Sequence, residues 1–460
     1  MSDEWQGREV LVLGLGETGL SCVRWLARHG ARLVAADTRA APPALGAIRA
    51  EHPQLRVVLG PFDPALLEGV DAVVASPGVA LRESVLRAAA ARGIEVAGDV
   101  EIFARALALR EPRPRVLGVT GTNGKSTVTA LASAMGEAAG LRAHAVGNIG
   151  VPVLDALGRA EAEGFADLYV VELSSYQLET TSSLALDAAT VLNVTQDHLD
   201  RYDSLADYAR AKERIFMHCG RRVVNRDDAW SAAMADANAW SFGLGEPADE
   251  LQWGLDPQRT LRRGGEALLA ASEMGMPGLH NVANGLAAHA LGTAAGIAPE
   301  AMAQALREFR GLPHRVQPVA EARGVRFYDD SKGTNVGASV AALEGFEVPV
   351  VLIAGGEGKG QDFAPLAPAV RSHARAVVLI GRDAPLIAAA LEGTGVEVVR
   401  AAGMDDAVQA AFTRAHEGDA VLLSPACASF DMFRDYAERG RVFKREVKQL
   451  AEELSKTREQ

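Results

Sequence analysis

The feature that most constrains the fold is a pair of glycine-rich turns, each lying between an apolar strand and a helix. The first is GLGETG, residues 14–19, which follows the apolar run EVLVL. The second is TGTNGKST, residues 120–127, which follows VLGV. A strand, a glycine turn and a helix form a phosphate site, because the glycines let backbone N–H groups approach the oxygens at a helix N-terminus. The chain is therefore predicted to hold two phosphate-bearing ligands on α/β sheets.

The first turn indicates a nucleotide without saying which one. At the end of the next predicted strand, Asp37 is followed by Thr38 and Arg39. In a dinucleotide-binding domain an acidic residue at this place binds the ribose hydroxyls. An arginine beside it can equally hold a phosphate or the edge of a uracil-type ring. NAD and another nucleotide both remain open on these residues.

The second turn is more specific. We expect Lys125 to reach the β- and γ-phosphates of a nucleoside triphosphate and the Ser126 hydroxyl to bind Mg²⁺. The spacing departs from the usual motif, because Val119 stands where a glycine is expected. A magnesium site also needs carboxylate oxygen, and Glu172 ends the apolar strand LYVVE.

Composition excludes several classes of protein. The chain has 460 residues and a formal net charge of −12, so it lacks the overall basic character of a nucleic-acid binder. Its three cysteines form no CxxC pair, which gives no support for a zinc site or a disulfide framework. The first residues are polar, and no apolar run approaches the roughly 18 to 20 residues that span a bilayer. We expect a reduced, cytoplasmic protein without a membrane span.

Along the chain, strands alternate with helices in three α/β units. A proline-rich segment, REPRPR, ends the first unit, and GLPHR ends the second. Within the second unit, residues 229–277 show no clear hydrophobic period, so their fold is not predicted. Further residues that can carry chemistry lie in loops or on a helix: His198, Lys212, Lys332 and Lys359. Taken alone, each is more often an ordinary surface residue.

The order of the motifs resembles that of the Mur ligases, which build peptidoglycan precursors. The segments that carry the resemblance are GLGETGLSC, DTR, SPGVAL, GDVEIF, TGTNGKST, GNIG, ELSSYQLETTSSL, NVTQDHLDRY, LPHR, DDSKGTNVGA and SPACASFD. They run nearly from end to end, and they match best the branch that adds D-glutamate to UDP-N-acetylmuramoyl-L-alanine. The resemblance implies an ATP-dependent ligase that works through an acyl phosphate with two Mg²⁺ ions. The expected partners are the small-molecule substrates and no nucleic acid; an oligomer is not implied, and we expect a monomer.

The resemblance further implies a division of labour among three domains. A Rossmann-like domain, residues 1–105, would hold the UDP part of the substrate in place of NAD. A central domain with a parallel sheet like that of P-loop ATPases, residues 106–311, would bind ATP. A second Rossmann-like domain, residues 312–460, would bring the amino acid.

Roles of single residues follow from the same resemblance, position by position. Contacts to the UDP-linked substrate match Thr18, Asp37, Thr38, Arg39, Ser76, Asn148 and Ser174. The ATP phosphate loop matches Gly121, Thr122, Asn123, Gly124, Lys125, Ser126 and Thr127, and adenosine contacts match Asn281, Asn284, His314, Arg315 and Asp330. Glutamate-binding positions match Lys332, Thr334, Lys359, Ser429 and Phe430. Metal ligands match Ser126, Glu172, His198 and Lys212, the last as a carbamate formed with CO₂. The catalytic set is Lys125, His198, Lys212 and Lys332.

Other functions account for less of the sequence. An NAD-dependent dehydrogenase would leave TGTNGKST without a role. A nucleotide-regulated binding protein would need no metal-binding histidine. Folylpolyglutamate synthase shares the ATP loop but lacks the N-terminal UDP domain. Another Mur-type ligase, or a variant that adds L-glutamate, remains an alternative.

Overall fold

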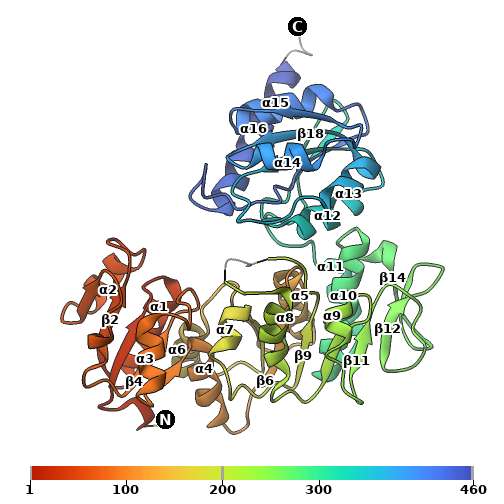
Figure 1. Ribbon diagram of the computed structural model, residues 1–460. Coiled ribbons are helices and arrows are strands. Elements are labelled where there is room, and N and C mark those ends of the chain that lie inside the picture. The colour runs from red at the N-terminus through yellow and green to blue at the C-terminus, as the bar shows by residue number, and fades with distance from the viewer. Residues whose placement is uncertain (1–2, 198–200, 457–460) are drawn as a thin grey trace. The chain divides into compact units, whose positions relative to one another are not determined.

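The computed structural model describes residues 3–197 and 201–456 (Figure 1). The chain divides into two compact units. One unit comprises Met1–Val194, Ala206–Leu269 and Gly285–Leu306, and the other comprises Thr195–Leu205, Ala270–Asn284 and Arg307–Gln460. The first unit carries two β-sheets and the second carries one.

The N-terminal sheet is parallel and has the strand order β3-β2-β1-β4-β5. Its strands are β1 (Glu9–Leu13), β2 (Arg32–Asp37), β3 (Arg56–Leu59), β4 (Ala72–Ala75) and β5 (Glu95–Ala97). Its helices are α1 (Glu17–Arg28), α2 (Leu45–Glu51) and α3 (Ser84–Ala91). The buried positions of β1 are all apolar, as in a strand that is covered on both faces, and its Leu11 and Leu13 pack in one cluster with α3. This order places the β1–α1 turn at the centre of the sheet, where doubly wound folds bind ligands.

The central sheet follows the order β14-β13-β12-β11-β10-β9-β6-β8-β7. Its strands are β6 (Arg115–Thr120), β7 (Ala143–Gly147), β8 (Leu168–Glu172), β9 (Ala188–Val191), β10 (Arg222–Asn225), β11 (Trp240–Phe242), β12 (Gln252–Leu255), β13 (Thr260–Arg263) and β14 (Glu266–Ala270). Its helices are α4 (Asp99–Ala108), α5 (Lys125–Ala138), α6 (Val153–Glu163), α7 (Ser175–Glu179), α8 (Leu205–Glu213), α9 (Ala229–Ala232), α10 (Leu279–Ala294) and α11 (Pro299–Glu308). Strands β9, β6, β8 and β7 run parallel, so their carboxyl ends share one edge.

The segment 229–277, which has no period in the sequence, forms the short helix α9, the strands β11 to β14 and a 3-10 helix at Ala271–Glu273. Strand β12 pairs parallel with β11 and antiparallel with β13, so the direction of the sheet changes here. Trp253 of β12 is fully buried and donates from Nε1 to Nδ1 of His289 on α10, at 3.0 Å. Burial lowers the pKa of His289 to about 4, which keeps the ring neutral and able to accept this bond.

The C-terminal sheet has the order β15-β16-β20-β17-β18-β19, with β15 as an antiparallel edge strand. Its strands are β15 (Gln317–Ala322), β16 (Val325–Asp329), β17 (Val350–Gly355), β18 (Ala374–Ile380), β19 (Glu397–Arg400) and β20 (Ala420–Leu423). Helices α12 (Val336–Glu344), α13 (Leu366–His373) and α14 (Ala384–Ala390) cover one face, and α15 (Met404–Arg414) and α16 (Tyr436–Lys456) cover the other. The sequence did not predict β15.

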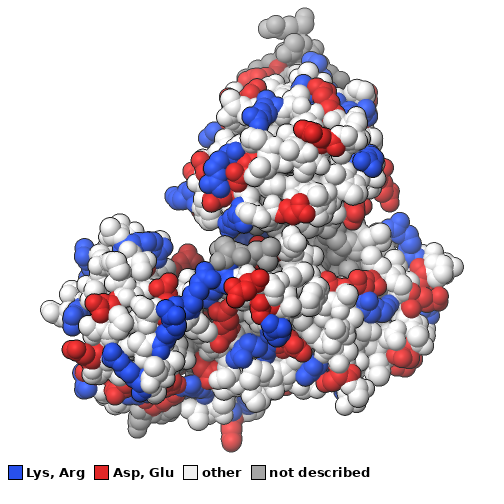
Figure 2. Space-filling model, in the orientation of Figure 1, with Lys and Arg blue, Asp and Glu red and all other residues white. Residues whose placement is uncertain are grey.

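No helix within residues 3–197 and 201–456 combines the length and the apolar character that crossing a membrane requires. On the face shown in Figure 2, basic and acidic side chains are mixed rather than gathered into one basic area. We therefore expect each phosphate site to be formed by the backbone N–H groups and single basic side chains of its own loop.

Candidate functional site

The β1–α1 turn is held tightly by its own backbone and by Ser76. Gly14 has a φ of 86°, a left-handed conformation that favours glycine. A Cβ atom at Gly19 would clash with the Gly14 carbonyl oxygen. Ser76 Oγ, which follows β4, donates to the same oxygen at 2.7 Å. Ser76 therefore supports the turn, and Thr18 lies in the first turn of α1 beside it.

Asp37 is occupied within the protein. It is only 2% exposed, and its Oδ2 accepts from Leu15 N–H at 2.7 Å and from Arg39 Nη2 at 2.6 Å. Its Oδ1 accepts from the backbone N–H and the Nε of Arg39, both at 2.8 Å. The Arg39 bonds, assisted by the Leu15 N–H, lower the pKa of Asp37 to about 2. Asp37 thus fixes both the turn and Arg39, whose side chain is 51% exposed beside it.

The second glycine turn joins β6 to α5 and has a positive φ at two glycines, which other residues rarely adopt. Gly121 has a φ of 150° and Gly124 a φ of 84°. A Cβ at Gly121 would lie 3.0 Å from Leu192 Cβ, so the loop passes close to the segment after β9. Lys125 opens α5, and its Nζ donates back to the carbonyl oxygens of Gly121 and Thr122, each at 2.9 Å. The ammonium group therefore lies over the loop that the sequence predicts to bind phosphate.

Asn193 holds this loop, although it is absent from the predicted site. Its Oδ1 accepts from Asn123 N–H at 2.8 Å, and its Nδ2 donates to Asn123 O at 3.1 Å. Its backbone oxygen accepts from Thr122 N–H at 2.9 Å. Asn193 follows β9, which pairs in parallel with β6. The sequence could place Asn193 just after a predicted strand. It could not show that Asn123 is its partner, because that depends on the order of strands in the sheet.

Lys212 is a buried residue of α8. It is 1% exposed, and its Nζ donates to Gly121 O at 2.8 Å. The same nitrogen lies 4.3 Å from the centroid of the Tyr208 ring. The interpretation of Lys212 as an ordinary solvated helix lysine is therefore wrong, since its amine lies against the phosphate loop.

Glu172 ends β8 beside the same loop. It is 1% exposed and lies opposite Val119 of β6 in the parallel register. Its Oε1 accepts from Asn148 Nδ2 at 2.8 Å, whereas no described residue donates to its buried Oε2. A buried carboxylate oxygen without a partner is costly, and a hard cation would satisfy it.

The carboxylate environment is sparse. Within the described ranges there is no group of three or more His, Cys, Asp and Glu residues that could hold a metal ion. His198, the predicted histidine ligand, lies outside the described residues.

Ser174 and Gln177 link the central sheet to α4. Ser174 caps α7, with its Oγ accepting from Gln177 N–H at 3.2 Å. Gln177 Nε2 donates to Asp99 Oδ2 at 3.3 Å. Asp99 opens α4 and is fully buried, and this burial raises its pKa to about 6.

In the second unit, paired aspartates lie at the end of β16, with Asp329 its last residue and Asp330 the next. Asp330 is buried, and its Oδ2 accepts from Ser424 Oγ at 2.7 Å. Burial raises the pKa of Asp330 to about 7. The neighbouring Asp329 contacts His314 Nδ1 at 2.6 Å and Lys444 Nζ at 3.2 Å. Sequence reasoning missed Asp329, which holds the predicted adenosine contact His314 in place.

The other predicted adenosine contacts in this unit lie near the start of α10 and beside His314. Asn281 Nδ2 donates to Pro277 O at 2.7 Å, and Asn284 Nδ2 donates to Asn281 Oδ1 at 3.4 Å. Arg315 follows His314 in the chain. Burial, with a smaller contribution from the charge of Arg315, lowers the pKa of His280 to about 4. These residues belong to the same compact unit as Asp330.

The predicted glutamate positions follow the strands of the C-terminal sheet. Lys332 Nζ lies 3.9 Å from the Tyr436 ring centroid, and Lys359 Nζ lies 5.7 Å from that of Phe430. Phe430 is 64% exposed, whereas its neighbour Ser429 is buried. Thr334 lies between Lys332 and α12, and its N–H donates to Lys332 O at 2.9 Å. The structure brings these residues to loops of one unit, each lysine against an aromatic ring.

Comparison with known proteins decides the family. A UDP-N-acetylmuramoylalanine–D-glutamate ligase of Methylobacillus flagellatus is 53% identical over 448 residues, which cover 96% of this chain and 97% of the relative. The chain belongs to the Mur ligase family. Another relative of the same name, from Thiobacillus denitrificans, is 53% identical over 461 residues and covers 97% of both chains. The resemblance seen in the motifs is confirmed.

Family models match successive parts of this Mur ligase. The MurD-like N-terminal domain model matches residues 8–98, the middle domain model matches 119–292, and the glutamate ligase domain model matches 314–427. Among solved structures, a UDP-N-acetylmuramate–alanine ligase of Thermotoga maritima has a TM-score of 0.59 at 19% identity and covers 96% of this chain and 99% of its own. A pseudomurein peptide ligase type C of Methanothermus fervidus has a TM-score of 0.60 at 16% identity and covers 96% and 100%. These likenesses confirm the predicted fold of three α/β domains.

Proposed function

We propose that this Mur ligase joins D-glutamate to UDP-N-acetylmuramoyl-L-alanine with ATP, in the synthesis of peptidoglycan precursors. The observation that carries the proposal is the convergence of Lys125 and Lys212 on the Gly121 carbonyl, in a glycine loop that opens a helix. A phosphoryl-transfer site needs such a cradle of backbone groups with a cation, which Lys125 supplies. Relatives about half identical over nearly the whole chain carry the name of this ligase.

The three domains take the three substrates in this proposal. Residues 1–105 hold the UDP-linked substrate, residues 106–311 bind ATP, and residues 312–460 bind D-glutamate. The state of Asp37 supports UDP over NAD at the first turn, because both its oxygens are already bonded to Leu15 and Arg39. A ribose would have to displace those bonds, whereas the half-exposed Arg39 can contact a pyrimidine ring or a phosphate.

The chemistry requires that the carboxylate be activated, because a carboxylate and an amine do not condense in water. The terminal carboxylate of the alanyl group attacks the γ-phosphate of ATP, forming an acyl phosphate and releasing ADP. Lys125 offsets the charge on the phosphate oxygens during this transfer. The amine of D-glutamate then attacks the acyl carbon, and the C–O bond to phosphate breaks as the amide forms.

Ser126 and Glu172 are the described residues that would hold Mg²⁺, with His198 as a further ligand. The unpartnered Oε2 of Glu172 supports this assignment. When bound, the metal supplies positive charge to the oxygens of the transferring phosphoryl group.

Lys212 is proposed to carry a carbamate. Burial favours the neutral amine of a lysine over its charged form, and a neutral amine reacts with CO₂ to give a carbamate anion and a proton. The product replaces a cation with an anionic oxygen group beside the phosphate loop, where a metal needs ligands. The burial of Lys212 against Gly121 supports its place at the reacting phosphate.

The proposal is tested by phosphate release from ATP in the presence of Mg²⁺ and UDP-N-acetylmuramoyl-L-alanine. D-Glutamate, L-glutamate, L-lysine and no amino acid are compared with the same enzyme. We expect only D-glutamate to stimulate release. Equal rates with L-glutamate would overturn the stereochemical assignment, stimulation by lysine would favour another Mur-type ligase, and no stimulation by any amino acid would overturn the ligase proposal.

A further inference from the structure

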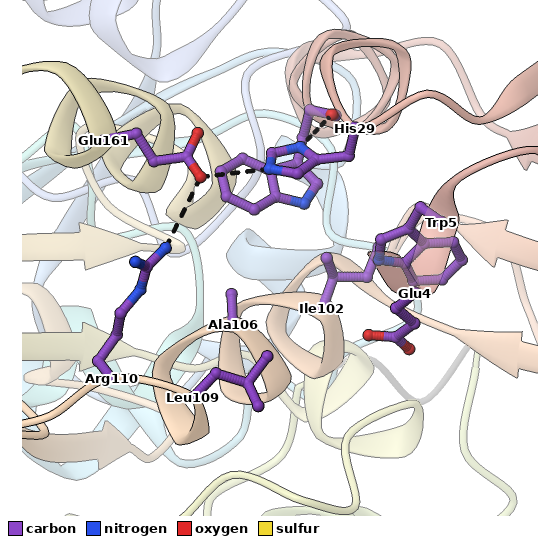
Figure 3. A pocket seen from close by; sticks show the side chains of 9 residues that line it. Glu4, Trp5, His29, Ile102, Ala106, Leu109, Arg110 and Glu161 are labelled. Carbon is purple, nitrogen blue, oxygen red and sulfur yellow. Dashed lines mark hydrogen bonds and ion pairs between the residues drawn. The ribbon is translucent and has the colours of Figure 1, made fainter. Parts of the chain in front are cut away.

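A cavity of about 300 Å³ lies between the C-terminal parts of α1, α4 and α6, within the first unit (Figure 3). Trp25 and His29 come from the end of α1, Ala106 from α4, and Glu161 from α6. The N-terminal segment adds Trp5. The volume falls within the range of small-molecule sites, and the lining combines aromatic and aliphatic surface with a few polar groups.

The walls suit a flat ring. The imidazole of His29 stacks on the Trp25 indole with ring centroids 4.0 Å apart and an interplanar angle of 30°. Figure 3 shows His29 on one side of the cavity and Trp5 on another, with Ile102 and Ala106 of α4 also facing it. Flat aromatic ligands gain most from aromatic walls, because stacking adds to the burial of apolar area.

The charges at the cavity are balanced within the protein. Glu161 Oε1 lies 3.2 Å from His29 Nε2 and 3.7 Å from Arg110 Nη2. Glu4 Oε1 pairs with Arg105 Nη1 at 2.9 Å. Each of these carboxylates already has a basic partner. A charged ligand could form an ion pair here only by breaking one that exists within the protein. An uncharged ligand is therefore favoured.

Arg110 adds hydrogen-bond donors to the cavity wall. Its guanidinium lines the cavity and lies over the Phe165 ring, 4.2 Å from the ring centroid. The guanidinium carries more N–H groups than the one that faces Glu161, so a ligand that brings a carbonyl oxygen can accept from it. The Glu161 carboxylate nearby can in turn accept from a ligand N–H.

We propose that this cavity is a second small-molecule site, which binds a flat, uncharged heteroaromatic with a lactam edge. The aromatic walls take the ring, an N–H of the Arg110 guanidinium donates to the carbonyl, and the carboxylate of Glu161 accepts from the adjacent N–H. The site lies at the far end of α1 from the β1–α1 turn, and a helix of 12 residues is about 18 Å long. Glu161 lies in the last turn of α6, at the opposite edge of the central sheet from the carboxyl ends of its parallel strands, where the second glycine turn lies. Binding should therefore not compete with nucleotides at either glycine turn.

The test uses the full-length protein labelled with 5-fluorotryptophan and the probe quinazolin-4-one, a flat fused lactam. The chain has five tryptophans, so the ¹⁹F NMR spectrum resolves which of them respond. We expect the resonances of Trp5 and Trp25 to shift on titration, and those of Trp230, Trp240 and Trp253 to stay unchanged. Saturating ATP or UDP should leave the titration curve unaltered. Quinazoline, which has the same rings without the lactam edge, should bind at least about tenfold more weakly.

A matched pair of variants on α4 locates the binding. Ala106→Phe fills the cavity and should abolish the shifts, whereas Ala108→Phe adds the same ring at an exposed position and should preserve them. If Ala106→Phe does not fold, Ala106→Leu serves as the smaller filling variant. Unchanged shifts in the filled variant, equal affinity for the two probes, or displacement by nucleotide would each overturn the proposal, as would the absence of shifts at Trp5 and Trp25. None of these outcomes depends on the ligase activity.

Discussion

Replacing Asn193 with alanine tests whether the phosphate loop is preorganised by a residue that does not belong to it. The side chain makes two hydrogen bonds to Asn123, one from its Nδ2 and one to its Oδ1, at 3.1 and 2.8 Å. Each such bond contributes about 0.5 to 1.5 kcal/mol, so the loss totals about 1 to 3 kcal/mol. If these bonds keep the loop in its ATP-binding conformation, the loop of the variant has to be ordered when ATP binds. The free energy of ATP binding becomes weaker by the same amount. A penalty of this size corresponds to a KM for ATP raised about 5- to 150-fold.

The assay is phosphate release with ATP varied and the other substrates saturating. The effect should fall on KM for ATP, with kcat changed much less, because the loop regains its shape once ATP is bound. Asn225→Ala is the control. That residue ends β10 and also makes two side-chain bonds, from its Nδ2 to Leu192 O at 2.9 Å and from Asp227 N–H to its Oδ1 at 3.0 Å, without touching the loop. Its KM for ATP should stay near the wild-type value. A wild-type KM for ATP in Asn193→Ala would refute the reasoning.

Three further predictions concern other residues of the account. Lys125→Ala should lower kcat by about a hundredfold or more while UDP-substrate binding, measured by calorimetry, stays intact; near-normal turnover would remove Lys125 from the mechanism. Lys212→Ala should lose most activity and recover part of it with high formate or acetate, and wild-type activity of this variant in CO₂-depleted buffer would rule out the carbamate. Burial raises the pKa of Asp99 to about 6, against about 3.9 in an unfolded chain. Between these two values the folded protein keeps a proton on Asp99 that the unfolded chain has released. The folded state therefore loses up to about 3 kcal/mol of stability as the pH rises from about 4 through about 6. Asp99→Asn should remove that loss, so its advantage in urea unfolding should grow from about pH 4 to about pH 8; an advantage that does not change with pH would contradict this.

The sequence predicted the parallel strands well because they are buried on both faces. LYVVE was predicted as a strand and forms β8 with the same bounds, Leu168–Glu172. Continuous apolar runs of this kind end where the backbone leaves the sheet, which is also where ligands bind. The two glycine turns were visible for the same reason, since each follows such a run.

The outer strands could not be predicted. Strands β11 to β13 are three or four residues long, and their burial depends on Trp253 reaching His289 of α10, which lies far along the chain. Short runs of this kind carry too few positions to establish a period. Strand β15 escaped prediction because only its end is buried, so its side chains follow no clear alternation.

Contacts across the sheet were also beyond the sequence. Asn193 could be placed at a strand end, but its bond to Asn123 follows from β9 lying beside β6. Lys212 is the opposite case, because composition and periodicity favour a surface lysine and only the family resemblance assigned it a role. Its burial against Gly121 is consistent with that assignment, which stays a prediction until the variant is measured.

The most direct test of the central claim follows the oxygen atoms of the substrate. UDP-N-acetylmuramoyl-L-alanine labelled with ¹⁸O in both oxygens of its terminal carboxylate is incubated with the enzyme, ATP, Mg²⁺ and D-glutamate, and the released phosphate is analysed by mass spectrometry. Activation as an acyl phosphate transfers one carboxylate oxygen to phosphorus, so each phosphate formed should carry one ¹⁸O and the amide product should retain the other. Phosphate free of ¹⁸O, released at the rate of product formation, would contradict the account.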